Sequence, residues 1–351
     1  MPRRPEAAEA VGENQEAVAG SWREAIEARW RPRRCSATDQ WKAVTVGLPR
    51  TLVVLGASLA VAAACSSDDH GRALPKPNPV TSRTVSPPAS PPASPPAGVP
   101  GQTVALALTW DGTGRSALVH VPAKPATSPA LVVVLHGARS TGALSDARFH
   151  FDPLSDRDGF VVAYPDGIDR GWNSSLAAGE PDDLGFLFAL VDRLQAQYHT
   201  DSRAVFVAGI SNGAAMAYRL ACERPDRIAA VGGVAGSPAT CEPTQPVSVV
   251  HVHGLADRVV PFEASDVPGG LAVWRRTDAC PTDVLTSKQG EVTHRVWGPC
   301  AAGTAVELYT IDSGRHQWPG SDPSPIPGAD PPSPLLDATG AIWAFFAAHH
   351  R

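Results

Sequence analysis

The sequence has few aromatic residues and little positive charge. Aromatic side chains make up 6% of its 351 residues, and the formal net charge is −5. No basic stripe follows the first 42 residues, although such a stripe is the electrostatic mark of a protein whose main ligand is a nucleic acid. This balance argues against a nucleic-acid partner.

Cysteines at metal-binding spacing are also missing. No C-x-x-C pair occurs, so we do not expect a zinc site. We expect no cofactor either. Four cysteines follow Cys35 and Cys65, and four allow three pairings. We favour Cys222–Cys241 with Cys280–Cys300, because each bond then closes a loop of about 20 residues and stabilises the fold by about 2–4 kcal/mol. Four unpaired buried thiols are the alternative, which is less expected outside the cytoplasm.

No apolar run at the start of the chain is long enough to cross a membrane comfortably. The run at residues 51–64 holds roughly 14 residues and follows Arg50, as in an export signal. Its small residues lead into Cys65 and a polar stretch, which resembles a bacterial lipoprotein signal whose cysteine is lipidated and becomes the mature N-terminus. Ala62 stands where Leu, Val or Ile is usual, so ordinary cleavage or an uncleaved anchor stays open.

These features divide the chain into four parts. Residues 1–43 form a polar leader, interpreted as an over-long start before a signal peptide at residues 44–65. Residues 66–102 are rich in Pro and Ser, which favours an extended, stiff tether. Residues 103–351 then form one domain of roughly 250 residues, ample for a large core. We expect an extracytoplasmic protein, held at the cell membrane by a lipid on Cys65 or otherwise secreted.

The folded domain alternates strand-like apolar runs with helical stretches. The predicted strands are residues 104–108, 116–121, 130–135, 160–164, 204–208, 229–234, 247–253 and 305–311. The predicted helices are residues 183–198, 213–224, 270–276 and 337–348. Strands rich in Val, Leu and Ala without polar alternation are typical of strands buried on both faces. The sequence therefore predicts an α/β fold, with a mostly parallel central sheet and helices on both faces.

The most informative motif is Gly-Ile-Ser-Asn-Gly at residues 209–213. It follows a predicted strand and opens a predicted helix, which is the layout of a nucleophile elbow around Ser211. Glycine on both sides relieves the clashes of so tight a turn. The motif alone can arise by chance in a chain with 31 glycines, so its interpretation depends on the partners that a serine nucleophile needs.

Two residues after later strands supply those partners. Asp257 is the first acid after the strand at 247–253, where a buried carboxylate can orient an imidazole, and His253 is expected to support its loop. His316 follows the strand at 305–311. The carboxyl ends of parallel strands meet at one edge, where ligands bind. The order Ser211, Asp257, His316 is that of the α/β-hydrolase fold, although a turn-capping Asp257 and a surface His316 are the plainer interpretations.

Backbone donors for an oxyanion hole are expected in two loops. In the hydrolase arrangement, an N–H from the loop after the strand at 130–135 acts with the N–H that follows the nucleophile. We therefore predict Ala138 and Asn212 as the two donors. An ordinary turn is the alternative interpretation of the first loop.

Together these pieces resemble the secreted polyhydroxybutyrate-depolymerase-like esterases, a family that includes feruloyl and acetylxylan esterases of carbohydrate esterase family one. The most specific matches are Tyr-Pro-Asp-Gly at residues 164–167 and His-Gln-Trp-Pro-Gly at residues 316–320. Further matches lie at residues 135–137, 158–163, 171–173, 182–186, 209–213 and 253–257. The lipoprotein branch of this family is consistent with Cys65.

The resemblance implies a serine esterase with Ser211 as nucleophile, His316 as general base and then acid, and Asp257 as the residue that orients it. It also implies a substrate pocket lined by His136, Trp172 and Trp318, although packing in the core or at the rim is an equal alternative for the two tryptophans.

Three functions are compatible with these residues. The favoured one is a monomeric exported esterase acting on short acyl or hydroxyacyl esters, polyhydroxybutyrate-type esters, or feruloyl or acetyl groups on polysaccharides. A serine peptidase or amidase on the same fold is one alternative, and a non-catalytic binding lipoprotein is another. The chain lacks a segment that resembles a polymer-binding module, so we do not expect efficient attack on insoluble polyester.

Overall fold

The computed structural model describes residues 100–238 and 241–351. The predicted leader, the signal peptide with Cys65 and nearly all of the linker lie outside the described residues. Among the helices of the described part, none has the length and hydropathy that a membrane span requires.

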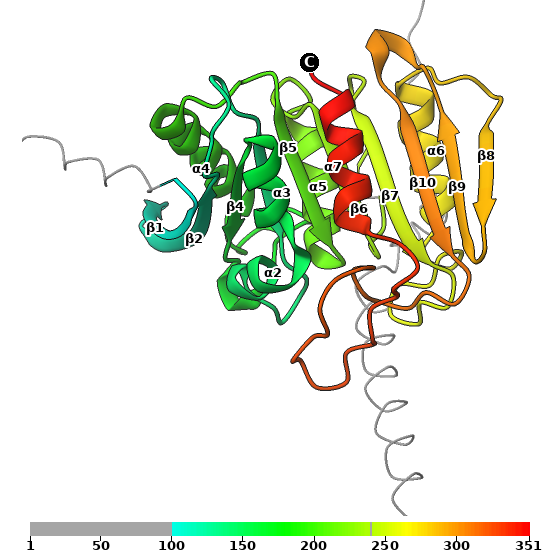
Figure 1. Cartoon of the computed structure of the whole chain (residues 1–351), viewed down its shortest axis with the longest axis horizontal. Coiled ribbons are helices and arrows are strands. Elements are labelled where there is room, and N and C mark those ends of the chain that lie inside the picture. Colours follow the sequence, from blue (N-terminus) through cyan, green and yellow to red (C-terminus); the bar gives the residue numbers. More distant parts are fainter. Residues whose placement is uncertain (1–99, 239–240) are drawn as a thin grey trace, which may run out of the picture. The chain divides into compact units, whose positions relative to one another are not determined.

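A ten-stranded sheet runs through the domain (Figure 1). Its strand order is β1-β2-β4-β3-β5-β6-β7-β10-β9-β8. The six neighbouring strands from β4 to β10 in that order run parallel, and antiparallel strands form both edges. The strands are β1 (Gln102–Trp110), β2 (Thr113–Val121), β3 (Leu131–Leu135), β4 (Val161–Pro165), β5 (Val205–Ile210), β6 (Ala230–Val234), β7 (Ser248–Gly254), β8 (Leu285–Gln289), β9 (Val292–Trp297) and β10 (Val306–Ile311).

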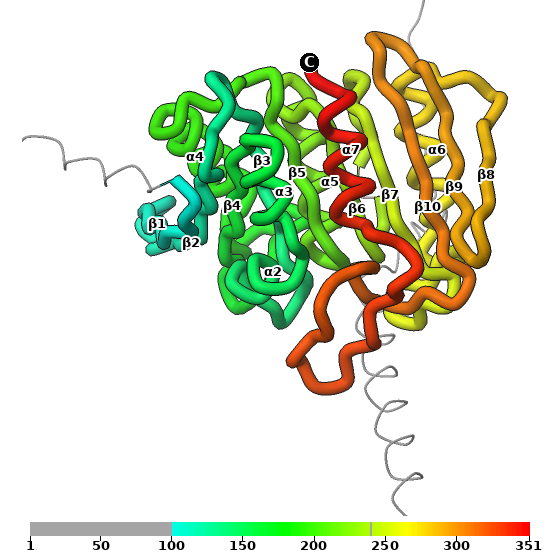
Figure 2. The backbone as a smooth tube through the Cα atoms, viewed as in Figure 1, coloured from blue at the N-terminus to red at the C-terminus, as the bar shows by residue number. Residues whose placement is uncertain are grey.

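Helices cover both faces of this sheet (Figures 1 and 2). One core cluster holds side chains of α4, α5 and α6, and a second cluster, on the other face, holds side chains of α2, α3 and α7. The strands β3 to β7 are buried along their whole length, which explains their lack of polar alternation. The helices are α2 (Gly142–Phe149), α3 (Phe151–Asp158), α4 (Asp183–Tyr198), α5 (Asn212–Glu223), α6 (Val267–Thr277) and α7 (Ala338–Ala348), with short 3-10 turns η1 (Ile168–Arg170) and η2 (Ala301–Gly303).

The predicted fold class is confirmed. All eight predicted strands and all four predicted helices are present, and their ends differ from the predicted ones by no more than three residues. The structure adds α2, α3 and the β8–β9 hairpin, which were not predicted from the sequence.

Two disulfides join the cysteine pairs that the loop lengths favour. Cys222 near the end of α5 is bonded to Cys241. Cys280, just beyond α6, is bonded to Cys300. Each bond therefore joins the carboxyl end of a helix to a segment about 20 residues further along the chain. Closing a loop of this length stabilises the fold because it lowers the conformational entropy of the unfolded chain.

Asp278, at the end of α6, is a buried carboxyl with an incomplete set of hydrogen bonds. Its Oδ1 accepts from the Val247 N–H at 3.2 Å, whereas Oδ2 has no partner among the described residues. Burial raises its pKa from 3.8 to about 6. Since the folded protein holds this proton to higher pH than the unfolded chain does, the free energy of unfolding falls as pH rises from about 4 to about 6.

Replacing Asp278 with Asn is therefore expected to stabilise the protein in neutral and alkaline solution. The substitution removes a buried charge, and we expect a gain of about 1–3 kcal/mol in the free energy of unfolding at pH 8. The gain shrinks as pH falls below 6, where the aspartate is protonated. Urea unfolding at pH 4.5, 6 and 8 measures it, with exposed Asp283→Asn as control. An equal gain at all three pH values would contradict this account of Asp278.

Candidate active site

Three parallel strands bring the three predicted catalytic residues to the side of the sheet where the carboxyl ends of these strands lie. β5 ends at Ile210, β7 at Gly254 and β10 at Ile311, and the predicted residues follow within five positions of these ends. Backbone bonds continue the sheet past these ends, from Ser211 N to Val234 O and from Leu255 N to Ile311 O, both at 2.9 Å. The frame of the site is therefore an extension of the core.

Ser211 lies in a strained turn between β5 and α5. Its φ of 56° and ψ of −119° are unfavourable for a residue with a Cβ. The glycines on either side are required by close approach: a Cβ on Gly209 would lie 2.4 Å from Gly213 O, and one on Gly213 would lie 2.3 Å from Leu135 O. The turn leaves the Ser211 side chain partly exposed at the end of the sheet.

His316 and Asp257 form a short hydrogen bond. His316 Nδ1 lies 2.7 Å from Asp257 Oδ2. Asp257 is fully buried, and its other oxygen accepts from Val259 N and Val260 N, both at 2.8 Å. Because a carboxylate only accepts, Nδ1 of His316 is the donor in this bond, and Nε2 is the ring nitrogen that does not face Asp257. No hydrogen bond joins His316 to Ser211 in the described part of the chain, and such bonds are often long without substrate.

A buried chain of hydrogen bonds supports Asp257 from behind. His253 Nε2 donates to Val260 O at 2.8 Å and lies 3.6 Å from Asp257 Oδ2. His253 Nδ1 then accepts from His251 Nε2 at 2.9 Å, and His251 Nδ1 accepts from the Tyr218 hydroxyl at 2.7 Å. Burial lowers the pKa of both histidines, so both imidazoles are neutral. This chain ties the Asp257 loop to β7 and α5, as expected of His253.

The two predicted oxyanion donors are available. Ser140 N donates to Gly137 O at 3.1 Å and Arg139 N to Arg170 O at 2.7 Å, whereas no acceptor among residues 100–238 and 241–351 takes the N–H of Ala138 or Asn212. The Ala138 loop lies close to Ser211, since a Cβ on Gly137 would be 3.6 Å from Ser211 Cβ. Both N–H groups are thus free to meet an oxygen atom.

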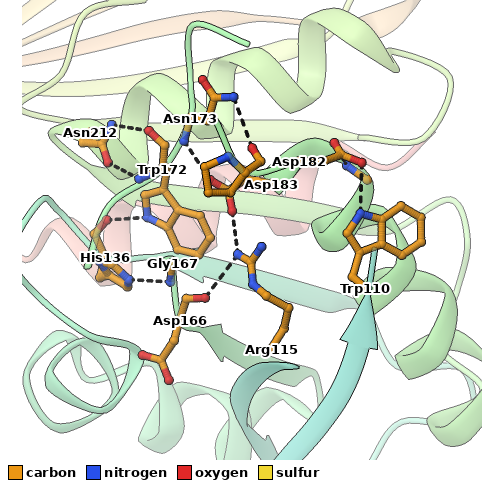
Figure 3. Close-up of polar contacts among 12 residues, drawn as sticks. Trp110, Arg115, His136, Asp166, Gly167, Trp172, Asn173, Asp182, Asp183 and Asn212 are labelled. Carbon is orange, nitrogen blue, oxygen red and sulfur yellow. Dashed lines mark hydrogen bonds and ion pairs between the residues drawn. The ribbon is translucent and has the colours of Figure 1, made fainter. Parts of the chain in front are cut away.

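His136 does not line a pocket, contrary to the sequence prediction. Its side chain is fully buried, and its Nδ1 donates to Gly137 O at 2.8 Å. Its Nε2 accepts from Gly167 N at 3.0 Å (Figure 3). Burial lowers its pKa, which keeps the ring neutral. An imidazole with both nitrogens occupied joins the loops after β3 and β4 and has no free nitrogen for a substrate.

The two tryptophans pack inside the protein as well. Trp318 is fully buried, stacks on Phe149 with ring centroids 4.3 Å apart and donates its indole N–H to Thr339 Oγ1 at 2.9 Å. Trp172 is 6% exposed and lies against His136 with centroids 4.9 Å apart. Of the two roles open to them, the structure supports packing.

A buried ion pair beside the site was not predicted from the sequence. Asp182 caps α4 through the Gly185 N–H, but Asp183 is buried and lies 2.5 Å from Arg115 (Figure 3). The sequence offers one signal for this ion pair, namely two adjacent aspartates at the start of α4. An N-cap uses only one carboxylate, so the other is available for a different partner. In the described residues, no group of three or more His, Cys, Asp or Glu side chains is arranged to hold a metal ion.

The chain is similar to known esterases. The family model described as "Esterase PHB depolymerase" matches residues 116–271, which include Ser211 and Asp257. NocK of Nocardia uniformis subsp. tsuyamanensis, named provisionally as an esterase, is 29% identical over 78% of this chain and 91% of its own length. The chain is a polyhydroxybutyrate-depolymerase-like esterase. It is a carboxylic ester hydrolase.

Other proteins that this chain resembles differ from it in length. The bifunctional acetylxylan esterase/xylanase XynS20E of Neocallimastix patriciarum is 26% identical over 60% of this chain, which spans only 32% of that protein. An acetyl xylan esterase from Aspergillus awamori shares the fold, with a TM-score of 0.51 and 18% identity over 70% of this chain and 99% of the other.

Proposed function

We propose that this esterase cleaves its substrates through Ser211, His316 and Asp257. The observation that carries the proposal is the 2.7 Å bond between His316 and buried Asp257 at the same sheet edge as the strained Ser211 turn. An imidazole held in this tautomer has a free Nε2, which is the atom that takes a proton from a serine hydroxyl.

In the proposed reaction, Ser211 Oγ attacks the ester carbonyl while His316 Nε2 takes its proton. The carbonyl oxygen becomes an oxyanion that the N–H groups of Ala138 and Asn212 stabilise. Collapse breaks the bond to the alcohol, which leaves with the proton from His316, and an acyl-Ser211 ester remains. Water, deprotonated by His316, then releases the carboxylic acid and restores the serine. Asp257 stabilises the imidazolium in both halves.

The proposed substrates are esters outside the cytoplasm. The names of relatives include acetylxylan esterase and feruloyl esterase, and we propose short acyl, hydroxyacyl, acetyl or feruloyl esters as substrates here.

A lipid on Cys65 would hold the enzyme at the cell membrane. Replacing Cys65 with Ser is then expected to move the protein from the membrane fraction to the medium, measured by immunoblot. Unchanged membrane association would contradict lipid anchoring.

A fluorophosphonate probe tests the proposed chemistry directly. We expect one covalent adduct, on Ser211, located by peptide mass spectrometry, and loss of p-nitrophenyl butyrate hydrolysis in proportion to labelling. A matched pair of p-nitrophenyl ester and p-nitroanilide with the same acyl group separates an esterase from an amidase. Faster turnover of the anilide would favour an amidase, and a folded protein that resists labelling would favour a binding role.

A further inference from the structure

The segment from Asp166 to Asn173, between β4 and α4, contacts both loops that hold the proposed oxyanion donors. Gly167 N donates to His136 Nε2 at 3.0 Å, and Arg139 N donates to Arg170 O at 2.7 Å. These two contacts fasten the segment to residues on both sides of Ala138 (Figure 3 draws the first). The segment is thus the immediate neighbour of the first donor.

Trp172 extends this contact to the second donor. Its indole N–H donates to His136 O at 2.9 Å. Its backbone N–H donates to Asn212 Oδ1 at 2.7 Å, and Asn212 Nδ2 donates back to Trp172 O at 3.0 Å (Figure 3). One residue therefore holds the loop after β3 through its side chain and the residue after the nucleophile through its backbone.

A buried ion pair fixes the position of Trp172 from the other side. Asn173 N donates to Asp183 Oδ2 at 2.7 Å, and Asp183 Oδ1 accepts from Arg115 at 2.5 Å. The side chains of Arg115 and Asp183 are 3% and 1% exposed, and the guanidinium lies 3.8 Å from the Phe186 ring centroid. A buried charge pair with a defined geometry resists displacement, because separating the partners leaves an uncompensated charge.

We propose that Trp172 is a positioning residue that sets the spacing between the N–H groups of Ala138 and Asn212. The inference rests on the proposed function, in which both groups stabilise the oxyanion. Such donors act only when they lie about 2.7–3.1 Å from the oxygen, and a misplacement of about 1 Å can cost two orders of magnitude in rate. Trp172 is the residue that is hydrogen-bonded to both loops, so its contacts control that distance.

The variant Trp172→Phe tests this role, because it keeps an aromatic ring and removes the donation to His136 O. In the full chain we expect kcat for p-nitrophenyl butyrate to fall by about 10–100-fold, with KM changed by less than about twofold. The inhibition constant of phenylboronic acid, which forms a tetrahedral adduct on the serine, should rise by a similar factor. Trp343→Phe is the matched control, since it removes an indole bond to Asp158 instead, and its kcat should not change.

Asn212→Ala provides a second variant that does not alter the tryptophan. It keeps the backbone N–H and removes both side-chain bonds to Trp172, so the same fall in kcat at constant KM is expected. Full kcat in either folded variant overturns the positioning role, while Ser211-dependent hydrolysis by the wild type leaves the proposed function standing. If the wild type shows no such hydrolysis, both proposals are wrong.

Discussion

Replacing Ser211 with Ala is expected to lower kcat for p-nitrophenyl butyrate by about 10⁵–10⁶-fold. The variant loses the oxygen that forms the acyl-enzyme in the proposed reaction, and removal of a serine nucleophile from a complete triad has effects of this size. The fold should be unaffected, because alanine has the same Cβ as serine and adopts the φ of 56° at the same cost. Stopped assays with high enzyme concentration measure the residual rate.

The control for this prediction is Ser287→Ala on edge strand β8, a serine with an exposed side chain. Its kcat and its Tm should equal those of the wild type. A Ser211→Ala protein with a wild-type Tm and more than about 1% of the wild-type kcat would assign nucleophilic attack to another group.

Replacing Asp257 with Asn is expected to lower kcat by about 10⁴-fold. Two N–H groups, from Val259 and Val260, point at one oxygen of this side chain at 2.8 Å each. They orient an asparagine with its oxygen toward them and its NH2 toward His316. The amide then donates to Nδ1 of His316, so the ring proton moves to Nε2, where it blocks proton transfer from Ser211.

Steady-state kinetics with p-nitrophenyl butyrate and a Tm measurement test the Asp257 prediction. Asp312→Asn, an exposed aspartate next to β10 that pairs with Lys288, serves as the control and should keep full activity. A fall of less than about tenfold in a folded Asp257→Asn protein would mean that the carboxylate does not orient His316.

Much of the domain could be predicted from the sequence. Strands that are buried on both faces appear as continuous apolar runs, and α4 and α7 each begin after an aspartate that caps the helix. The parts that were missed have weak local signals. α3 contains Pro153 in its first turn, where proline is tolerated, and a largely polar sequence. The β8–β9 hairpin turns at Gly290 with a φ of 59°, but all residues of β8 are exposed, so no apolar pattern marks it.

The candidate site shows the same division. The residues at the ends of β5, β7 and β10 could be predicted because a strand and the turn after it are recognised from a short stretch of sequence. The order of these stretches along the chain then indicated which residue follows which strand. The roles of His136 and Trp318 were not, because their partners come from distant elements, such as Gly167 for His136 and Thr339 for Trp318. A motif identifies which residues gather, whereas three-dimensional packing decides which of them stay accessible.

Two residues just beyond the strands that carry the proposed triad, Ser211 and Leu255, are still joined to neighbouring strands by backbone hydrogen bonds. Among the described residues, the loops that carry the site are fastened to the centre of the sheet, so we expect its groups to separate mainly when the sheet itself opens. Inactivation by denaturant and loss of secondary structure then belong to one cooperative event. For this enzyme, residual turnover in urea becomes a direct reading of the fraction of molecules that are folded.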